Sequence, residues 1–307
     1  MVERHALIFV LLASIHLLLV PDVARGKLKA VVTLPDLGAL LREVGGERIT
    51  IHTVARGDQD PHYVPAKPSH LIRFRGAQLL VFNGLELEAG WLPLLLQGAR
   101  NPRLRPGKLG VLNASRVVRV LEVPVGEVSR AKGDIHPFGN PHIMLDPRNG
   151  LKILQLISNT VVQLDPKAAA AFRERTSTFS RRLSDKIRRW SERLAPYRDQ
   201  EVVTYHRVWS YFFSWSGLRY AEVIENKPGI PPSPSHVSRV IETMRSRKIP
   251  VIFVAHYTPP KVARRVAALA GARAVVLPAL VGADSTIRTY EDLFEVLVSK
   301  VVRALEG

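Results

Sequence analysis

The sequence predicts an α/β protein of two lobes, each with a parallel-type sheet flanked by helices, joined by one long rigid linker helix. Three observations predict this fold. Short apolar strand patterns alternate with helical patterns, which is typical of parallel sheets with crossover helices. The alternation stops near residue 165 and resumes near residue 200. The residues between these two positions form one amphipathic helical pattern, with a single apolar stripe.

The first lobe is expected over residues 27–164. Its strand patterns occupy 28–33, 48–54 and 78–82. A helix at 36–44 ends at a pair of glycines. Another helix begins at Asp146 and Pro147, because Asp is a favoured N-cap and Pro a favoured first helical residue. Apolar residues then follow at helical spacing.

The linker helix is expected over residues 165–198. Its apolar stripe consists of Phe172, Phe179, Leu183, Ile187, Trp190 and Leu194. A helix of that length extends about 45 Å at 1.5 Å per residue. Since such a helix is stiff, we expect limited closure between the lobes.

The second lobe is expected over residues 199–307, where the alternation of strands and helices resumes. Strand patterns occupy 201–205, 249–255 and 272–277, and helical patterns occupy 235–246 and 260–269.

Residues 1–26 have the layout of a secretory signal peptide. An apolar run from Ala6 to Val20 follows Arg4, and small residues precede an expected cleavage site after Gly26. The run is short for a membrane-spanning helix, which needs roughly 20 apolar residues. An uncleaved anchor is the alternative. We expect a soluble protein exported to the periplasm.

Composition excludes several classes of protein. The chain has 44 Lys and Arg against 27 Asp and Glu, a formal net charge of +17, and no cysteine. Disulfide scaffolds, thiolate metal sites and an acyl-cysteine lipoprotein anchor are therefore excluded. The positive charge suggests nucleic acid or an anionic membrane as a partner. Nucleic acid is not expected, because the aromatic residues of the basic linker lie on its apolar stripe.

Four residues are candidate metal ligands. His62 lies in a turn after a strand, His142 follows Pro141, and His206 ends a strand. Asp284 also follows a strand end. In open α/β sheets ligands bind beyond the carboxyl ends of strands. Three imidazoles and one carboxylate make a four-coordinate set suited to Zn²⁺.

The other histidines of the two lobes are interpreted differently. His52 lies within a strand pattern and is expected to be structural, while His70 and His236 begin helices and are expected at the surface. His256 ends a strand and is an additional candidate ligand.

The chain resembles a known family, the metal-binding solute-binding proteins of ABC importers for zinc and manganese (cluster A-I, the zinc-uptake periplasmic proteins). The segments that carry the resemblance are Asp58-Gln59-Asp60-Pro61-His62, Asn83-Gly84-Leu85-Glu86-Leu87-Glu88 with Trp91, Asn140-Pro141-His142, Tyr205-His206 and Gly229-Ile230-Pro231-Pro232-Ser233-Pro234. The resemblance implies one metal between the lobes, with His62 and His142 from the first and His206 and Asp284 from the second. It also implies a membrane permease as partner, and we expect the chain to be a monomer.

Zinc is the expected cargo, because manganese-binding relatives typically have Glu at the position of His206 and carboxylate-rich sites suit Mn²⁺. Two departures from the family stand out. The stretch 121–135 is short and lacks the histidines of many zinc members. The sequence around Asp284 is less regular than the histidine motifs, so His136 is the alternative fourth ligand. Asp60 is a candidate hydrogen-bond partner of His62.

Other functions remain open from the sequence. Mn²⁺ is the alternative cargo. An exported zinc hydrolase is a different class, since three histidines and a water can form a catalytic site. No His-Glu-x-x-His motif or similar compact motif supports it. A basic adhesin or membrane-surface protein has only the net charge in its favour.

Overall fold

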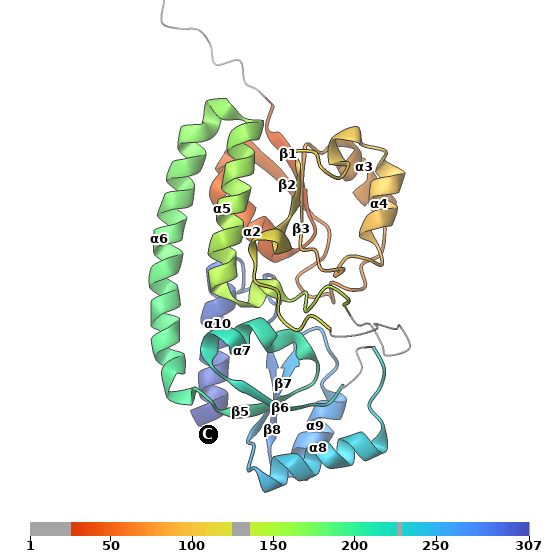
Figure 1. The fold of residues 1–307 in the computed structure, drawn as a ribbon, viewed down its shortest axis with the longest axis vertical. Helices are drawn as coiled ribbons and strands as arrows, with labels where there is room; N and C mark the ends of the chain where they lie inside the picture. The colour runs from red at the N-terminus through yellow and green to blue at the C-terminus, as the bar shows by residue number, and fades with distance from the viewer. Residues whose placement is uncertain (1–25, 125–135, 226–228, 307) are drawn as a thin grey trace, which may run out of the picture.

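The computed structural model describes residues 26–124, 136–225 and 229–306 of the 307-residue chain (Figure 1). Two parallel sheets lie one above the other in this view, and a long helix runs beside both of them. The expected signal peptide, apart from Gly26, lies outside the described residues, as does most of the stretch 121–135.

The first sheet contains four parallel strands in the order β2-β1-β3-β4. They are β1 (Leu28–Val32), β2 (Ile49–Thr53), β3 (Leu79–Phe82) and β4 (Val111–Asn113). The crossover helices are α2 (Pro35–Gly45), α3 (Pro68–Gly76) and α4 (Leu92–Ala99). The sequence predicted the first three strands, α2 and the start of α3 at His70, whereas the short elements β4 and α4 were not predicted.

The second sheet repeats this arrangement, with four parallel strands in the order β6-β5-β7-β8. They are β5 (Glu201–Thr204), β6 (Arg219–Val223), β7 (Val251–Ala255) and β8 (Arg273–Leu277). The helices around this sheet are α7 (Ser210–Ser216), α8 (Pro234–Ser246) and α9 (Lys261–Ala270). We call the part of the chain up to residue 164 the first half and the part from β5 onward the second half. In each sheet the chain reverses its direction of winding beside the first strand, which is where open α/β sheets form binding crevices.

The long helix α6 (Ala169–Leu194) has 26 residues and follows α5 (Pro147–Leu164). Short 3-10 turns at Pro166–Ala168 and Ala195–Tyr197 flank it. Its predicted apolar stripe is buried, except that Ile187 is half-buried. Asp146 caps α5 by accepting a hydrogen bond from the Arg148 backbone amide at 2.9 Å, as its sequence predicted.

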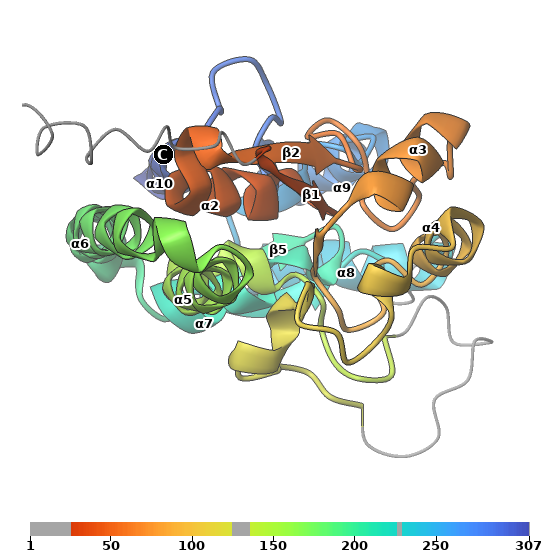
Figure 2. The same cartoon turned by 90° about the horizontal axis from the view of Figure 1, so that it is seen from above.

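The last helix, α10 (Tyr290–Glu306), ties the two halves together and was not predicted. It packs against α6, and the rings of Trp190 and Phe294 stack with centroids 5.5 Å apart. The Arg182 guanidinium bridges Glu43 of the first half at 3.1 Å and Glu291 of α10 at 3.0 Å. Figure 2 shows α5 and α6 lying together, on the side away from α3 and α4. The halves therefore share one hydrophobic core along α6.

None of the helices in the described residues combines the length and the apolar character that crossing a bilayer requires.

Candidate metal centre

The three predicted histidine ligands converge between the two halves. His62 comes from the loop after β2, His142 from the segment before α5, and His206 lies two residues after the end of β5. The His62 ring centroid lies 5.3 Å from that of His142 and 6.4 Å from that of His206. The His142 and His206 centroids are 5.9 Å apart. Residues separated by up to 144 positions thus meet at one point.

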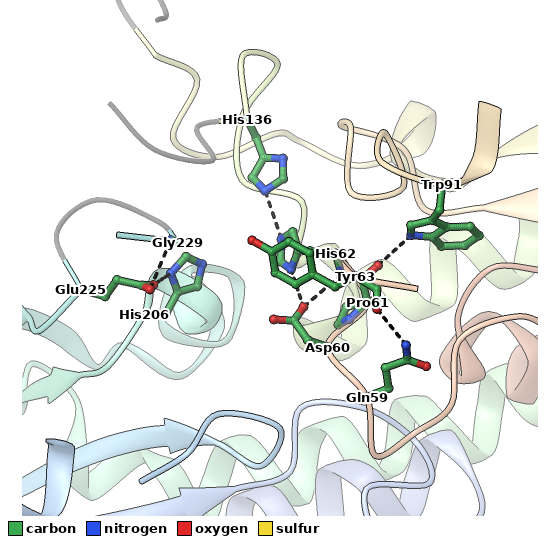
Figure 3. A network of polar contacts seen from close by, with 10 residues as sticks. All are labelled: Gln59, Asp60, Pro61, His62, Tyr63, Trp91, His136, His206, Glu225 and Gly229. Atoms are coloured by element: carbon green, nitrogen blue, oxygen red, sulfur yellow. Dashed lines mark hydrogen bonds and ion pairs between the residues drawn. The ribbon is translucent and has the colours of Figure 1, made fainter. Parts of the chain in front are cut away.

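A carboxylate orients His62 from behind (Figure 3). Asp60 Oδ1 lies 2.7 Å from His62 Nδ1 and accepts the His62 backbone amide at 3.0 Å. Burial opposes ionisation of Asp60, but its contacts with His62 keep the pKa of the carboxyl below 3.8. With Nδ1 engaged by a carboxylate, Nε2 is the nitrogen presented to the centre. The structure shows the contact that the sequence suggested for Asp60.

His206 has the same kind of support from a residue that the sequence analysis missed. Glu225 Oε2 lies 2.6 Å from His206 Nδ1, and Glu225 Oε1 accepts the Gly229 backbone amide at 3.2 Å. Glu225 follows β6, and its backbone amide donates to the Tyr205 carbonyl at 2.8 Å. Prediction of β6 as the neighbour of β5 would have placed Glu225 beside His206.

His142 is buried, and one of its ring nitrogens has no hydrogen-bond partner among the described residues. Its backbone amide donates to Asn140 Oδ1 at 3.0 Å, and its Nε2 finds no hydrogen-bond partner in the described part of the chain. Burial, together with the nearby imidazoles, holds the pKa of His142 well below 6.5. A neutral imidazole with an unused buried lone pair fits a metal ligand.

The motif at 83–91 braces the loops of two ligands. The Asn83 side-chain amide donates to the Pro141 carbonyl at 2.8 Å, beside His142. The Trp91 indole donates to the Pro61 carbonyl at 3.0 Å, beside His62. Glu88 is buried and accepts the Asn83 backbone amide at 2.7 Å, which fixes the start of the motif. These contacts give the motif a physical role in positioning His62 and His142.

His136 lies against the same point. Its Nε2 is 3.1 Å from His62 Nε2, with ring centroids 5.2 Å apart (Figure 3). Two nitrogens bound to one tetrahedral zinc ion would lie about 3.3 Å apart, given bonds of about 2.0 Å. No group of three or more His, Asp or Glu in the described ranges is already arranged around one ion position. The imidazoles would therefore need small rotations to enclose a metal.

The structure does not bring Asp284 into this group. Asp284 is exposed, and its Oδ1 accepts the backbone amide of Thr286 at 2.8 Å and the Thr286 hydroxyl. These hydrogen bonds, the side-chain one first, lower the pKa of the Asp284 carboxyl. The loop after β8 turns its carboxylate onto its own backbone, which is an interaction that sequence position alone does not reveal.

The loop that carries Asp284 nevertheless touches the loop of His62. A Cβ on Gly57 would lie 2.3 Å from the Val281 carbonyl oxygen, so the close approach requires glycine. His256, an additional candidate ligand from the sequence, lies 2.6 Å through Nε2 from the Gly57 carbonyl, and its Nδ1 accepts the Ala279 amide at 3.2 Å. Both ring nitrogens are thus engaged, and the Nε2 contact joins the two halves.

The expectation that His70 and His236 lie at the surface is wrong. Both are buried, and His236 Nε2 contacts the Val223 carbonyl at 2.8 Å. His70 Nδ1 lies 3.0 Å from Nε2 of His52, which has the structural role expected of it. Each helix packs its first turn against a neighbouring strand, so the helix start is covered.

A cavity of about 230 Å³ opens beside the histidines. His62, Asp60 and Tyr63 line it from the first half, and His206, Glu225 and Tyr257 from the second. The arrangement can bind a small cation through imidazole nitrogens, with carboxylates placed to balance its charge.

Comparison with known proteins decides the family. The family described as "Zinc-uptake complex component A periplasmic" matches residues 30–304. The chain belongs to this family. Its members include components of metal ABC importers, and the two-sheet fold with a long helix is the fold of ZnuA structures.

Individual relatives are distant but extend along most of the chain. The manganese ABC transporter substrate-binding lipoprotein PsaA of Streptococcus pneumoniae is 25% identical over 233 residues, covering 74% of this chain and 72% of PsaA. The iron-binding protein YfeA of Yersinia pestis is 22% identical, covering 92% of this chain and 88% of YfeA.

Solved structures agree with the fold. A crystal structure of ZnuA superposes with a TM-score of 0.75 at 20% identity, covering 91% of this chain and 99% of ZnuA. A manganese-bound mutant of a periplasmic metal-binding protein from Candidatus Liberibacter asiaticus gives a TM-score of 0.75 at 21% identity, with 91% of this chain and all of that one covered.

Proposed function

We propose that this protein captures Zn²⁺ outside the cytoplasm, between its two halves, and delivers it to the membrane permease of an ABC importer. Membership of the zinc-uptake family supports the role of substrate-binding component, which is not an enzymatic role. The choice of Zn²⁺ rests on the imidazoles that lie close together between the halves. Two of them, His62 and His206, contact the carboxylates of Asp60 and Glu225 through Nδ1.

The donor set favours zinc over manganese. Both nearby carboxylates contact imidazole Nδ1 atoms at 2.6–2.7 Å, so they act on the metal through the ring. Imidazole nitrogen is a common zinc ligand, whereas Mn²⁺ prefers carboxylate and water oxygens. The named relatives include a manganese and an iron protein, so membership of the family does not identify the metal. We therefore infer the metal from the ligand atoms of this chain.

For the coordination we propose His62, His142 and His206 as ligands, with His136 as the fourth. His136 Nε2 already lies 3.1 Å from His62 Nε2, whereas the Asp284 carboxylate is bound to Thr286. Asp284 can serve as the fourth ligand only if these hydrogen bonds break.

The test is calorimetric titration of the chelator-stripped chain, from Lys27 onward, with Zn²⁺ and with Mn²⁺. One tight Zn²⁺ equivalent, weakened at least a hundredfold in His62→Ala and in His206→Ala, is the expected result. Tight Mn²⁺ binding with weak Zn²⁺ binding would assign the other cargo. Absence of tight binding to either metal would overturn the proposal.

The fourth ligand needs its own comparison. His136→Ala is expected to weaken Zn²⁺ binding, while Asp284→Ala leaves it unchanged because that side chain contacts Thr286. The reverse pattern would restore the carboxylate as ligand. Extended X-ray absorption fine structure of the Zn²⁺ complex is an independent test. It counts the imidazole ligands, which are four with His136 and three with Asp284.

We further propose that the protein works as a monomer that docks on its permease through the rims beside the metal centre. Size-exclusion chromatography with light scattering tests the oligomeric state. A dimer of about twice the 34.2 kDa chain mass would contradict it.

A further inference from the structure

The first half of the chain concentrates unpaired positive charge at one end. Residues 61–121 contain nine Lys and Arg against two Glu, of which Glu88 is buried. All nine are exposed and form no ion pair with the residues that the structure describes. Six of them lie on α3, after α4 and in the segment before β4: Arg73, Arg75, Arg100, Arg103, Arg105 and Lys108. Elsewhere many arginines are paired, including Arg182, Arg193 and Arg247. The six cations are therefore free to bind an external anion.

Local contacts bring these cations together. The Asn101 side-chain amide donates to the carbonyls of Phe74 and Ala77, both at 2.8 Å, so the segment around Asn101 lies against the end of α3. The Leu80 amide donates to the Gly110 carbonyl at 2.7 Å, which brings the segment of Lys108 to the start of β3. We call these six cations the basic pole.

The basic pole lies at the end of the first sheet that faces away from the metal centre. The Gln78 amide donates to the Lys29 carbonyl at 2.8 Å, so the pole adjoins the start of β1. The metal centre lies beyond the opposite, carboxyl ends of the strands, between the two halves (Figure 1). A partner bound at the pole would leave the metal centre accessible.

Exposed aliphatic side chains accompany the charges. Ile72 is 69% exposed beside Arg73, and Leu109 is 46% exposed beside Lys108. Guanidinium groups bind phosphate through paired hydrogen bonds, and aliphatic side chains enter the boundary between headgroups and acyl chains. Exposed aromatic side chains, which single-stranded nucleic acid would use for stacking, are absent from these positions. The chemistry fits an anionic phospholipid surface.

The course of the chain agrees with that partner. The described chain enters at Gly26, next to β1 and therefore next to the basic pole. The segment that precedes it is the expected signal peptide, which brings this end of the chain to the bilayer before cleavage. The same end of the molecule thus combines the chain entry with unpaired positive charge.

We propose that the basic pole binds the anionic phospholipid surface of the membrane, so that the protein is held near the bilayer with its metal centre free. Polybasic surfaces gain attraction from each cation near an anionic bilayer, and the attraction falls as salt screens it. The proposal does not depend on which metal the centre binds.

The experiment uses the chain from Lys27 onward, so that the apolar leader contributes nothing. The protein is sedimented with vesicles of phosphatidylcholine alone and of phosphatidylcholine with 30% phosphatidylglycerol, in about 50 mM and about 300 mM NaCl. The pole variant changes all six cations to Gln. The control variant changes six other exposed cations to Gln and so has the same net charge: Arg173, Arg181, Arg189, Lys248, Arg264 and Arg265.

We expect binding to the anionic vesicles only, and weaker binding in the higher salt. Each cation that contacts the bilayer contributes about fivefold to the partition coefficient, so contact by only three of the six already predicts a loss of at least about a hundredfold in the pole variant, and far less in the control variant. Zn²⁺ titration of both variants checks that they fold, and a triple variant (R100Q, R103Q, R105Q) gives a smaller change if the sixfold variant fails to fold.

Four results would overturn the proposal. Equal losses in the two variants would show that net charge alone acts. Equal binding to neutral vesicles, or no binding at all, would remove the lipid partner. Binding to a single-stranded DNA oligomer as tight as to anionic vesicles, and lost in the pole variant, would assign the pole to polyanions in general. Metal binding is measured separately, so failure here leaves the proposed function testable.

Discussion

Carboxylates stand behind two of the three imidazoles, and their effect can be measured one residue at a time. Glu225 contacts His206 Nδ1 at 2.6 Å, and Asp60 contacts His62 Nδ1 at 2.7 Å. Such partners fix the ring orientation and raise the basicity of the ligating nitrogen. They distinguish His62 and His206 from a histidine that is merely near a cavity.

Glu225→Gln should lower Zn²⁺ affinity about 10- to 100-fold, because Gln keeps a hydrogen-bond acceptor but removes the negative charge behind His206. Calorimetry measures the change. Glu222→Gln is the matched control, since Glu222 lies on β6 but does not line the cavity. Equal affinity in the Glu225 variant and the wild type would show that the carboxylate does not act on the metal.

Asp36 is a buried carboxyl group at the start of α2. Neither of its oxygens has a hydrogen-bond partner among the described residues, although the backbone amides of Asp36 and Val281 act on it weakly. Burial raises its pKa from 3.8 to about 7. Its pKa in the folded protein therefore exceeds that in the unfolded chain. Stability should fall as the pH rises from about 4 to about 7.

Asp36→Asn should remove this dependence, because the amide cannot ionise. At pH 8 the variant should gain roughly 1–4 kcal/mol in free energy of unfolding over the wild type, and at pH 4 almost nothing. Urea unfolding at the two pH values measures the difference. Destabilisation of the variant at pH 8 would mean that the charged carboxylate makes a favourable contact in the folded state.

Among the structural elements, the loop that carries His62 depends on contacts from outside itself. Its Pro61 carbonyl accepts the Trp91 indole N–H, and the Gly57 carbonyl contacts His256 of the second half. A hydrogen bond of this kind contributes about 1 kcal/mol. The loop geometry is therefore set by the helical turn before α4 and by the end of β7 together.

Trp91→Phe should lower Zn²⁺ affinity several-fold, up to about tenfold, because the Pro61 carbonyl loses its donor while the ring still fills the core. Trp215→Phe is the control: its indole donates to Ser191 Oγ at 3.1 Å on α6, outside the metal centre. Both variants should lose similar stability, but only the first should lose affinity. Identical affinities in calorimetry would show that the bond does not position His62.

At the scale of the whole molecule, contacts across the metal centre oppose large closure. The Asn140 side-chain amide donates to the Arg207 carbonyl at 2.8 Å, and the Tyr211 hydroxyl donates to the Asn140 carbonyl at 2.9 Å. Glu122 and Arg207 form an ion pair at 2.8 Å. Together with α6, these contacts join the halves in the structure itself.

Zn²⁺ should therefore cause little change in overall shape. Small-angle X-ray scattering of the stripped and the Zn²⁺-loaded chain should give the same radius of gyration within error, whereas hinge closure would contract it. The variant Asn140→Ala loses the side-chain hydrogen bonds to the Arg207 carbonyl at 2.8 Å and to Ser210 Oγ at 3.2 Å, and so provides a reference in which the halves are less firmly joined. A clear contraction of the wild-type chain on zinc binding would contradict this expectation.

Local patterns in the sequence predicted the fold class, the long helix and the position of His62, His142 and His206 near one another. Strand and helix patterns are local, since they depend on the spacing of apolar residues along the chain. The apolar stripe of α6 and the capped start of α5 were readable for that reason. The helical spacing within Tyr290–Glu306 was equally local and would have indicated α10. The three-residue strand β4 is too short to give a pattern.

The other side-chain contacts at the centre depend on the tertiary fold. Glu225 contacts His206 because β6 pairs with β5, His136 lies against His62 across 74 residues, and Asp284 turns onto Thr286. Such contacts depend on strand order and on loop conformation. Neither leaves a periodic signal in the sequence, because a loop residue is placed by hydrogen bonds to distant backbone groups and to its own turn.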